Sequence, residues 1–295
     1  MSLFGSVITA MVTPFSEKGE VDLDEACRLA NYLLDNGSDM ILLAGTTGES
    51  PTLTHTEEEA LFRAVVGAVK GKGRVMAGAG SNCTKTAVKA SCVAKNCGVD
   101  ALLQVVPYYN KPNQEGLYQH FKAVSHASDL PIMLYNIPGR TGINLEVETV
   151  SRLTEFSNIV AIKEAAGSVD QVKKLFACVP ENFDIYSGDD ALTLSFLKQG
   201  AKGVVSVASH CAGNDIKLML KSALADDDER ALNLHQRLLP LFEVLFMTSN
   251  PIVVKAAMEL MGFKVGNPRL PLIPASNEQI LAVKKVLINL DIIKC

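Results

Sequence analysis

The segment Met40–Ser50 reads MILLAGTTGES and combines the two features that decide the fold. The apolar run Met40–Ala44 has the length of a buried β-strand, and the glycine-rich polar stretch Gly45–Ser50 follows it directly. A helix-like segment, Thr56–Lys70, comes next; we expect Thr56 to cap it, because three glutamates follow in the first turn. Strand, polar loop and helix in this order form the repeating unit of an α/β fold.

The same unit recurs along the first two thirds of the chain. Helix-like segments such as Asp22–Asn36, Thr84–Cys97 and Ser168–Val179 separate apolar or β-branched runs that start roughly 20 to 35 residues apart. This alternation indicates a parallel sheet with right-handed crossovers, either open and doubly wound or closed, and eight units favour a (β/α)8 TIM barrel. The eight runs are Val7–Met11, Met40–Ala44, Arg74–Gly78, Ala101–Val105, Ile132–Tyr135, Ile159–Lys163, Asp184–Ser187 and Gly203–Val207.

Polar and glycine-rich clusters follow the predicted strands and do not precede them. In a barrel such positions share one rim, the C-terminal face, where active sites lie. We therefore expect the functional site among these clusters. They are Gly45–Ser50, Gly78–Asn82, Pro107–Asn110, Asn136–Gly142, Lys163–Ala165, Ser187–Asp190 and Ser206–His210.

No strand is predicted after about Ala225. The remaining segments have helical patterns over Asp226–Phe246, Pro251–Met261 and Asn277–Leu290, and the proline-rich stretch Asn267–Pro274 separates the last two. We therefore expect a catalytic barrel over residues 1–225 and a small C-terminal helical appendage over residues 226–295.

Composition excludes several classes of protein. About half of the residues are apolar (48%), and 28 Lys and Arg against 32 Asp and Glu give a net charge of −4, which argues against binding to nucleic acid. The first residues lack the pattern of a signal peptide, and no apolar run is long enough for a membrane helix. Seven cysteines without a C-x-x-C pair favour free thiols over disulfides or structural zinc, and a cytoplasmic location.

Lys163 is the first candidate for catalysis. By the period-two rule, Ile159, Ala161 and Lys163 share one face of the sixth strand, which points into a barrel. Burial disfavours the charged form of an amine, and a neutral amine can attack a ketone to form an imine. The structural alternative is an ion pair, for example with Glu164, although strand alternation sends that side chain to the other face.

Hydroxyl groups and backbone amides lie near the same rim. Thr46 and Tyr135 are predicted at the tops of the second and fifth strands, where their hydroxyls can donate hydrogen bonds or pass protons; both are also ordinary strand residues. The glycine-flanked Gly45–Gly48 segment can hold a small anion, but it lacks the lysine of a Walker loop. Gly78–Gly80 lacks the third glycine of a dinucleotide motif.

The loops after the last two strands bear on the choice of substrate and on metals. Asp189 and Asp190 follow the seventh strand, where many barrels bind phosphate; two carboxylates would repel phosphate, so we expect an unphosphorylated substrate. A metal-dependent aldolase needs clustered ligands, whereas the five histidines are scattered and His210–Cys211 is the only suggestive pair. We therefore expect no metal.

Five motifs, in this order and spacing, carry a resemblance to a known family. From Gly5 to about Met261 the chain resembles the dihydrodipicolinate synthase family, which belongs to the pyruvate-dependent Schiff-base lyases. The resemblance implies a TIM barrel, no metal or other cofactor, and a role in lysine and diaminopimelate biosynthesis. The motifs are Gly45–Ser50 (GTTGES), Pro107–Asn110 (PYYN), Tyr135–Gly142 (YNIPGRTG), Ile162–Ala165 (IKEA) and Ser187–Asp190 (SGDD).

The resemblance also implies roles for single residues. Lys163 would form the imine with pyruvate, and Tyr135, Thr46 and Tyr109 would form a hydroxyl relay for protons. Tyr109 would come from a neighbouring subunit, so the active site would require a homodimer, and family members usually form homotetramers. Thr46 and Thr47 would hold the pyruvate carboxylate.

Further positions would complete the pocket. Gly188 and the Val205 carbonyl would line it, and Arg140 would bind the carboxylate of the second substrate, L-aspartate 4-semialdehyde, which suits the fork of a guanidinium. Without the motif around it, Arg140 would be read as a solvated loop residue.

Two other functions stay open at this point. A sister lyase that acts on sialic acid or a 2-keto-3-deoxy sugar acid would share Lys163, Tyr135 and the GTTGE motif; Arg140 and the Tyr108–Tyr109 pair argue against it. A non-catalytic binding barrel would be expected to lose Lys163 or the hydroxyls.

The resemblance finally predicts the response to lysine. In lysine-inhibited relatives the inhibitor binds at the dimer interface, and three positions depart from the sensitive pattern: Pro51 replaces a small residue, Glu58 a histidine and Thr86 a glutamate. Since the glutamate would pair with the incoming ammonium group, we expect weak or absent inhibition. The matching positions are Ser50, Pro51, His55, Glu58, Asn82, Thr86 and Tyr108.

Overall fold

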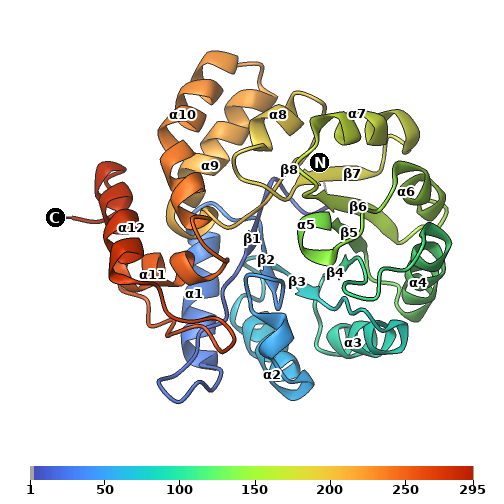
Figure 1. The fold of residues 1–295 in the computed structure, drawn as a ribbon, viewed down its shortest axis with the longest axis horizontal. Coiled ribbons are helices and arrows are strands. Elements are labelled where there is room, and N and C mark those ends of the chain that lie inside the picture. Colours follow the sequence, from blue (N-terminus) through green and yellow to red (C-terminus); the bar gives the residue numbers. More distant parts are fainter. Residues whose placement is uncertain (1–2, 295) are drawn as a thin grey trace.

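Eight parallel strands form a closed barrel in the computed structural model, which describes residues 3–294. Each strand pairs with the next along the chain, and the eighth closes the ring by pairing with the first, as Figure 1 shows. The predicted TIM barrel is therefore confirmed. The strands are β1 (Val7–Ala10), β2 (Met40–Leu43), β3 (Arg74–Gly78), β4 (Ala101–Val105), β5 (Ile132–Asn136), β6 (Ile159–Glu164), β7 (Asp184–Ser187) and β8 (Gly203–Ser206).

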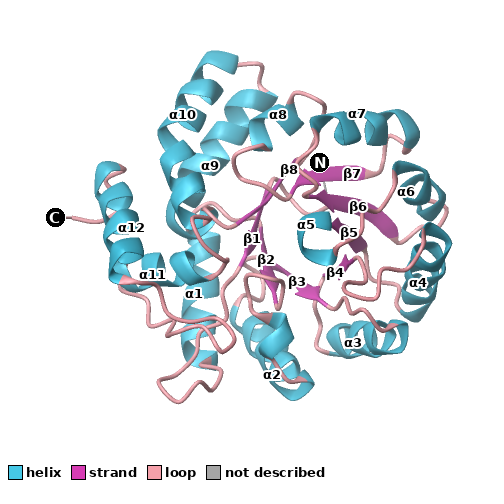
Figure 2. Ribbon diagram, viewed as in Figure 1, coloured by secondary structure: helices cyan, strands magenta, loops and turns pink. Residues whose placement is uncertain are grey.

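Helices surround the barrel and cover its outer face (Figure 2). Most of them lie between consecutive strands, as the alternating sequence pattern predicts. They are α1 (Leu23–Asp35), α2 (His55–Ala68), α3 (Thr84–Asn96), α4 (Gln114–Ala127), α5 (Pro138–Thr141), α6 (Val147–Leu153), α7 (Val169–Cys178), α8 (Thr193–Leu197), α9 (Ser209–Leu224), α10 (Asp228–Leu245), α11 (Ile252–Leu260) and α12 (Asn277–Asn289), with a short 3-10 helix, η1, at Ser50–Thr52.

Two apolar cores lie on the two sides of the sheet. The inner core fills the barrel with alternate strand residues such as Met40, Leu42 and Ala161. The outer core packs the other strand face, including Ile41 and Ile162, against the helices. Because both faces are buried, the strands read as continuous apolar runs in the sequence.

The sixth strand departs from simple alternation. Ile132 pairs with Ile159 but Met133 pairs with Ala161, so one residue of β6, Val160, is extra. Ile159 accordingly packs in the outer core, while Ala161 packs inside the barrel. The prediction that Ile159 shares a face with Lys163 is therefore wrong, and the β-bulge is the reason.

Helix α2 begins at His55, one residue before the predicted start at Thr56. Thr54, and not Thr56, is the N-cap: its hydroxyl accepts a hydrogen bond from the Glu57 N–H at 3.2 Å. The Glu57 carboxylate accepts from the Thr54 N–H at 2.8 Å, which completes a capping box. The expected cap, Thr56, is an exposed residue within the first turn.

The last three helices lie together on one side of the barrel, in the orange and red part of Figure 1. Each has the position expected from the sequence to within about two residues, the ordinary uncertainty of helix ends. The division of the chain at residue 225 stays a prediction. Among the described residues, no helix has both the length and the apolar character needed to span a membrane.

Candidate active site

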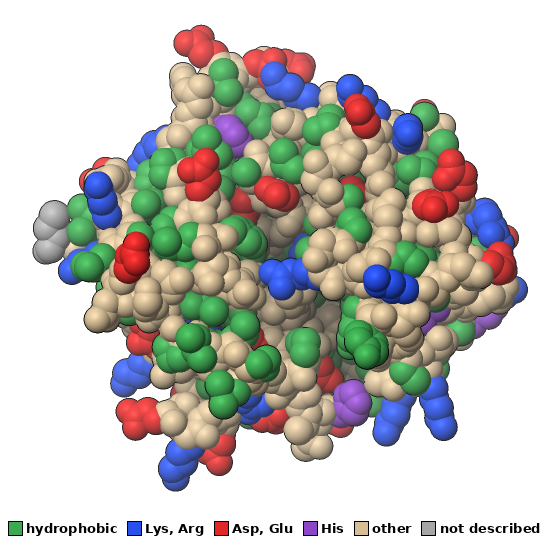
Figure 3. Space-filling view, in the orientation of Figure 1, with side chains coloured by type: hydrophobic (Ala, Val, Ile, Leu, Met, Phe, Trp, Pro, Cys, Tyr) green, Lys and Arg blue, Asp and Glu red, His purple; other side chains and the backbone are tan. Residues whose placement is uncertain are grey.

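A cavity of about 240 Å³ opens at the C-terminal ends of β2 to β5. Figure 3 shows the surface hollowed near the centre of this face, with basic side chains at the edge of the hollow. Four of the predicted cluster segments contribute to its wall. The cavity is lined by Ala44, Gly45, Thr46, Ser50, Pro51, Gly78, Gly80, Leu103, Val105, Tyr108, Tyr135, Ile137, Arg140 and Thr141.

Lys163 and Tyr135 are direct neighbours in the sheet. They pair across β5 and β6, and the Lys163 Nζ atom lies 4.2 Å from the centre of the Tyr135 ring. Lys163 is 6% exposed, and among the described residues it forms no ion pair. The structural alternative for this lysine, an ion pair, therefore has no support within residues 3–294.

Glu164 lies on the opposite face of β6, as alternation predicts. Its carboxylate accepts hydrogen bonds from Asn136 Nδ2 at 3.0 Å, from Gln171 Nε2 at 2.9 Å and from the Ala166 N–H at 2.7 Å. Burial raises the pKa of this carboxyl group, and these donors counter the increase. Glu164 is thus part of a buried polar network on the face of β6 opposite Lys163. Its hydrogen bonds with Asn136 attach it to the end of β5.

The Gly45–Ser50 loop presents two threonines at the top of β2. Thr46 lines the cavity, whereas Thr47 is 3% exposed and lies behind it. The Thr47 hydroxyl accepts a hydrogen bond from Asn250 Nδ2 at 2.9 Å. Since a hydroxyl both donates and accepts, its proton remains available to a bound carboxylate.

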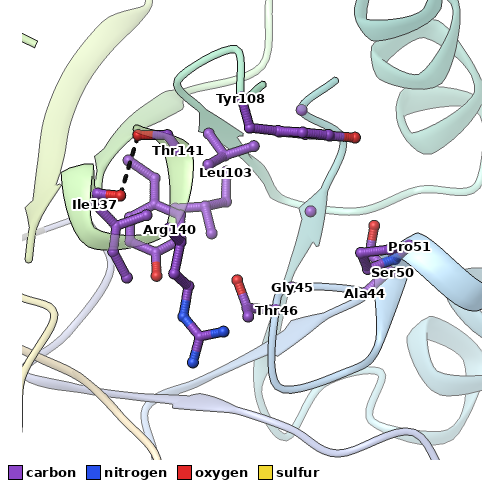
Figure 4. A pocket seen from close by; sticks show the side chains of 14 residues that line it. Ala44, Gly45, Thr46, Ser50, Pro51, Leu103, Tyr108, Ile137, Arg140 and Thr141 are labelled. Carbon is purple, nitrogen blue, oxygen red and sulfur yellow. Dashed lines mark hydrogen bonds between the residues drawn. The ribbon is translucent and has the colours of Figure 1, made fainter. Parts of the chain in front are cut away.

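Arg140 supplies the cationic group of the cavity. It belongs to α5, a single helical turn that follows β5, and Figure 4 shows its side chain pointing into the pocket. The Thr141 hydroxyl, by contrast, donates to the Ile137 carbonyl at 3.1 Å and so closes the turn on itself. No described residue forms an ion pair with Arg140, which leaves the guanidinium available to an anionic ligand.

Tyr109 does not line the cavity of its own chain. Its side chain is 88% exposed, and its backbone has the left-handed conformation (φ +74°) that few residues other than glycine adopt. A hydrogen bond from its N–H to the Thr141 carbonyl, at 3.3 Å, holds the loop against α5. An aromatic side chain that projects from the surface of its own subunit can reach a neighbouring one.

Gly188 lies beside Lys163, and Val205 packs in the core inside the barrel. A Cβ atom at Gly188 would come within 3.0 Å of Lys163 Cε and 2.7 Å of Ala165 Cβ, so only glycine fits there without a shift. Val205 belongs to the inner core, which also contains Tyr135. The structure therefore groups Lys163, Tyr135, Gly188 and Val205 together, and joins them to Thr46 and Arg140 through the cavity.

The family is decided by comparison with known proteins. Residues 3–290 match the model of the dihydrodipicolinate synthetase family. This chain belongs to that family. The resemblance seen in the sequence motifs is thus confirmed.

Relatives in the dihydrodipicolinate synthetase family are similar over their whole length. The 4-hydroxy-tetrahydrodipicolinate synthase of Thermosynechococcus vestitus is 55% identical over 100% of both chains, and 4-hydroxy-tetrahydrodipicolinate synthase 1 of Halalkalibacterium halodurans is 54% identical over 93% of both. The crystal structure of the Cyanidioschyzon merolae enzyme with lysine bound has a TM-score of 0.98 at 49% identity, over 99% of this chain and 100% of that one. A monomeric dihydrodipicolinate synthase variant has a TM-score of 0.96 at 41% identity, over 98% of both chains.

The SGDD motif of this family member has a structural role. Asp190 is buried and accepts hydrogen bonds from the N–H groups of Val207 and Ala208, each at 3.0 Å. Asp189 accepts from the N–H groups of Ala191 and Leu192. Backbone donors that bind phosphate in other barrels are thus occupied, which gives a second reason to expect an unphosphorylated substrate.

His210 also has a structural role. Its Nδ1–H donates to the Val207 carbonyl at 2.8 Å, and its Nε2 accepts from the Val12 N–H at 3.1 Å. Burial lowers the pKa of His210 to about 4 and raises the pKa of Cys211 to about 12. Both ring nitrogens of His210 are thus engaged, and no group of three or more potential ligand side chains occurs within residues 3–294.

Six of the seven residues matching the lysine site of relatives are divided between two cavities. Ser50 and Tyr108 line the main cavity, while His55, Glu58 and Thr86 line a small adjacent one of about 30 Å³. Glu58 is engaged there by His55, whose Nδ1 lies 3.1 Å from its carboxylate. Pro51 also lines the main cavity, and the Asn82 carbonyl accepts from Asn110 Nδ2 at 2.8 Å.

Sequence reasoning missed one group of residues near the site. Asn250, Lys255 and Arg269 come from the C-terminal segment but contact Thr47 and Glu49 of the GTTGES loop. The only signal available was a lysine within a mostly apolar helical run, Pro251–Met261. Nothing in the pattern indicates which distant carboxylate that lysine meets.

Proposed function

We propose that Lys163 carries out imine chemistry on pyruvate at the base of the cavity that opens at the ends of β2 to β5, where Tyr135 adjoins it. The chain condenses pyruvate with L-aspartate 4-semialdehyde, the reaction of the 4-hydroxy-tetrahydrodipicolinate synthases to which it is similar. The observation that carries the residue assignment is the buried Lys163 amine, without an ion pair in the described chain, 4.2 Å from the Tyr135 ring. A buried amine with no competing carboxylate among the described residues, next to a phenol that lines the cavity, is placed to add to a small ketone.

The proposed reaction proceeds through covalent steps that balance. The Lys163 amine adds to the pyruvate ketone and water leaves, which gives a protonated imine. Loss of a methyl proton gives an enamine, and its carbon attacks the aldehyde of the second substrate. The amino group of that substrate then attacks the imine carbon, closes the ring and releases Lys163. No external cofactor is needed, because the protonated imine accepts the electrons.

The remaining residues bind substrates and move protons in this proposal. Thr46 and Thr47 donate to the pyruvate carboxylate, and Arg140 binds the carboxylate of the semialdehyde as a fork. Tyr135 and Thr46 pass protons within one subunit, and Tyr109 enters from its neighbour. Gly188 and the Val205 carbonyl leave room beside the Lys163 chain for the imine.

Assembly and location follow from the same proposal. We propose a homodimer as the smallest active unit, because Tyr109 points away from its own cavity, and a pair of dimers as the full assembly. We place the reaction in the cytoplasm, since it belongs to amino-acid biosynthesis and the six described cysteines are free thiols.

A sister lyase acting on sugar acids is the second candidate. It would also use Lys163, but a sugar acid offers several hydroxyls where the semialdehyde offers a second carboxylate for Arg140. The cavity of about 240 Å³ with one free guanidinium favours the smaller, charged substrate. Pyruvate consumption with L-aspartate 4-semialdehyde, compared with cleavage of sialic acid and 2-keto-3-deoxy sugar acids, separates the two.

Borohydride trapping tests the chemistry directly. Incubation with pyruvate and borohydride should attach a reduced pyruvyl group to Lys163, located by mass spectrometry of peptides. Lys163→Ala should remain folded and take no label. Labelling of a different lysine, or none in the unmodified protein, would refute the mechanism.

A further inference from the structure

A buried ion pair joins the GTTGES loop to the C-terminal helices. The Glu49 carboxylate lies 2.7 Å from the Lys255 Nζ atom, and the two side chains are only 1% and 2% exposed. Lys255 belongs to α11 and also lies 4.1 Å from the centre of the Phe15 ring. Two fully buried charges are costly unless they are paired, so each depends on the other.

A second contact fixes the other oxygen of Glu49. The Arg269 N–H donates to Glu49 Oε2 at 2.8 Å. The Arg269 guanidinium donates to the Thr52 carbonyl at 2.7 Å and the Gly19 carbonyl at 2.7 Å, and forms an ion pair with Glu57. The C-terminal segment thus holds both ends of the turn that begins with Glu49.

The segment Ala44–Glu49, which contains both threonines, has a conformation that needs such support. Ala44 (φ +48°) and Glu49 (φ +57°) are both left-handed, an unfavourable state for residues with a Cβ atom. Such residues persist where surrounding contacts determine them, and they concentrate at functional sites. Inside the loop, the Thr13 hydroxyl donates to the Gly48 carbonyl at 2.6 Å.

The same C-terminal segment orients one of the threonines. Asn250, next to the start of α11, donates from Nδ2 to the Thr47 hydroxyl at 2.9 Å, and both residues are buried. Its Oδ1 atom is buried without a partner in the described chain, which is unusual for an amide held only for stability.

We propose that Glu49, Lys255 and Asn250 are positioning residues for the pyruvate carboxylate, which hold the GTTGES loop so that Thr46 and Thr47 direct their hydroxyl protons into the site. This inference rests on the proposed function, in which these hydroxyls bind the carboxylate. It makes the C-terminal helices part of the machinery that recognises pyruvate. None of the three residues needs to touch the substrate.

The alternative is that the ion pair only attaches the C-terminal helices to the barrel. Both accounts expect a loss of stability when the pair is broken. They differ in substrate binding. A loop that misplaces Thr46 and Thr47 weakens the binding of pyruvate, but it leaves Arg140 and the binding of the semialdehyde unaffected.

The test measures borohydride trapping at Lys163 against pyruvate concentration in Lys255→Met, Glu49→Gln and Asn250→Asp. Each single change should raise the half-saturating pyruvate concentration at least about tenfold, with the KM of the semialdehyde changed less than about threefold. The double variant Glu49→Gln/Lys255→Met should be less impaired than the product of the two single effects, because it leaves no unpaired buried charge.

A matched control comes from an ion pair at the other end of the barrel. Lys217 of α9 has its Nζ atom 2.6 Å from the carboxylate of Asp39, the residue before β2, so this partly buried pair also joins a helix to the barrel. Lys217→Met should lower the free energy of unfolding but change pyruvate half-saturation less than about twofold.

Each result decides between the accounts. Equal pyruvate half-saturation in Lys255→Met, Glu49→Gln and the unmodified protein would overturn the inference, as would equal shifts in Lys217→Met. If Lys255→Met does not fold, Asn250→Asp tests the same contact to Thr47 without exposing a charge pair. Absence of labelling in the unmodified protein would instead refute the proposed function.

Discussion

At the scale of single residues, Gly188 limits what can occupy the space beside Lys163. A methyl group at this position would approach Lys163 Cε to 3.0 Å, closer than most real contacts. Gly188→Ala should therefore slow imine formation by about tenfold or more, since misplaced reacting groups lose rate steeply. Stopped-flow trapping with pyruvate and borohydride measures this rate.

Gly67→Ala is the control for that change. Gly67 lies within α2, with no atom near a Cβ placed there. This variant should keep the unmodified rate of imine formation and gain slightly in stability, because alanine favours helix. An unchanged rate in Gly188→Ala would show that the Lys163 chain can move aside at little cost.

The lowered pKa of the buried His210 leads us to expect a loss of stability in mild acid. Its pKa is about 4 in the folded chain and 6.5 when unperturbed. Between pH 4 and pH 6.5 this histidine is therefore protonated in the unfolded chain but neutral in the folded chain. Its contribution is thus complete above pH 6.5 and lost as the pH falls through 4, by about 3 kcal/mol in total. In His210→Gln, urea unfolding between pH 7 and 4.5 should show a shallower decline.

The exposed His126 provides the comparison, because His126→Gln removes a histidine without a buried imidazole. That variant should keep the pH dependence of the unmodified chain. Parallel stability curves for His210→Gln and the unmodified chain would contradict the assignment.

At the scale of secondary-structure elements, the corrected cap of α2 gives a paired prediction. Thr54 satisfies a backbone donor in a capping box, whereas Thr56 is an exposed residue of the first turn. Thr54→Ala should lower the free energy of unfolding by about 1 kcal/mol, and Thr56→Ala by less than about 0.5 kcal/mol. Thermal or urea unfolding compares the two; a larger effect at Thr56 would restore the original prediction.

The elements themselves were predictable to different degrees. All eight strands follow from apolar runs that end in polar residues, because this pattern is local. The bulge at Val160 is not a local feature, because it depends on how β5 and β6 pair. The periodicity of the β6 sequence therefore cannot reveal it. The single turn α5 was missed for the opposite reason, since four residues are too few to show a helical period.

The site was predictable where motifs carry it. Thr46, Tyr135 and Arg140 line one cavity and Lys163 pairs with Tyr135, because strand ends share one rim of a barrel; their roles stay predictions. The Glu49–Lys255 pair was not predictable, because no local rule joins two residues from opposite ends of the chain. Long-range polar contacts of this kind are determined by packing of the C-terminal helices.

At the scale of the whole molecule, the exposed Tyr109 predicts an active site shared between subunits. Tyr109→Phe and Lys163→Ala should each be inactive alone. A reassembled equal mixture should recover about one quarter of the normal activity, because half of the dimers are mixed and each has one intact site. Activity assays on the mixture, with analytical ultracentrifugation to confirm mixed dimers, measure this recovery. No recovery from confirmed mixed dimers would assign Tyr109 to its own subunit.

Response to lysine is also expected at the scale of the assembly. Thr86 offers no charge partner to an ammonium group, and Glu58 is already engaged by His55. A lost charge partner worth roughly 1.5–3 kcal/mol weakens binding about ten- to a hundredfold. We expect weak or absent inhibition by L-lysine, measured by titration into the condensation assay, and stronger inhibition of Thr86→Glu. Cooperative inhibition of the unmodified enzyme below about 0.1 mM would contradict this prediction.

The extra residue in β6 bears on how this chain tolerates changes of length. Ile159 and Ala161 already face opposite sides of the sheet, so deletion of Val160 would join two residues in the alternation that a regular strand requires. Lys163 would keep its place. In β5, deletion of Leu134 would join Met133 and Tyr135, which both face the interior, and one of them would have to turn outward. The strand that carries the proposed nucleophile can therefore shorten by one residue during evolution and still direct Lys163 into the barrel, whereas β5 cannot lose Leu134 in this way.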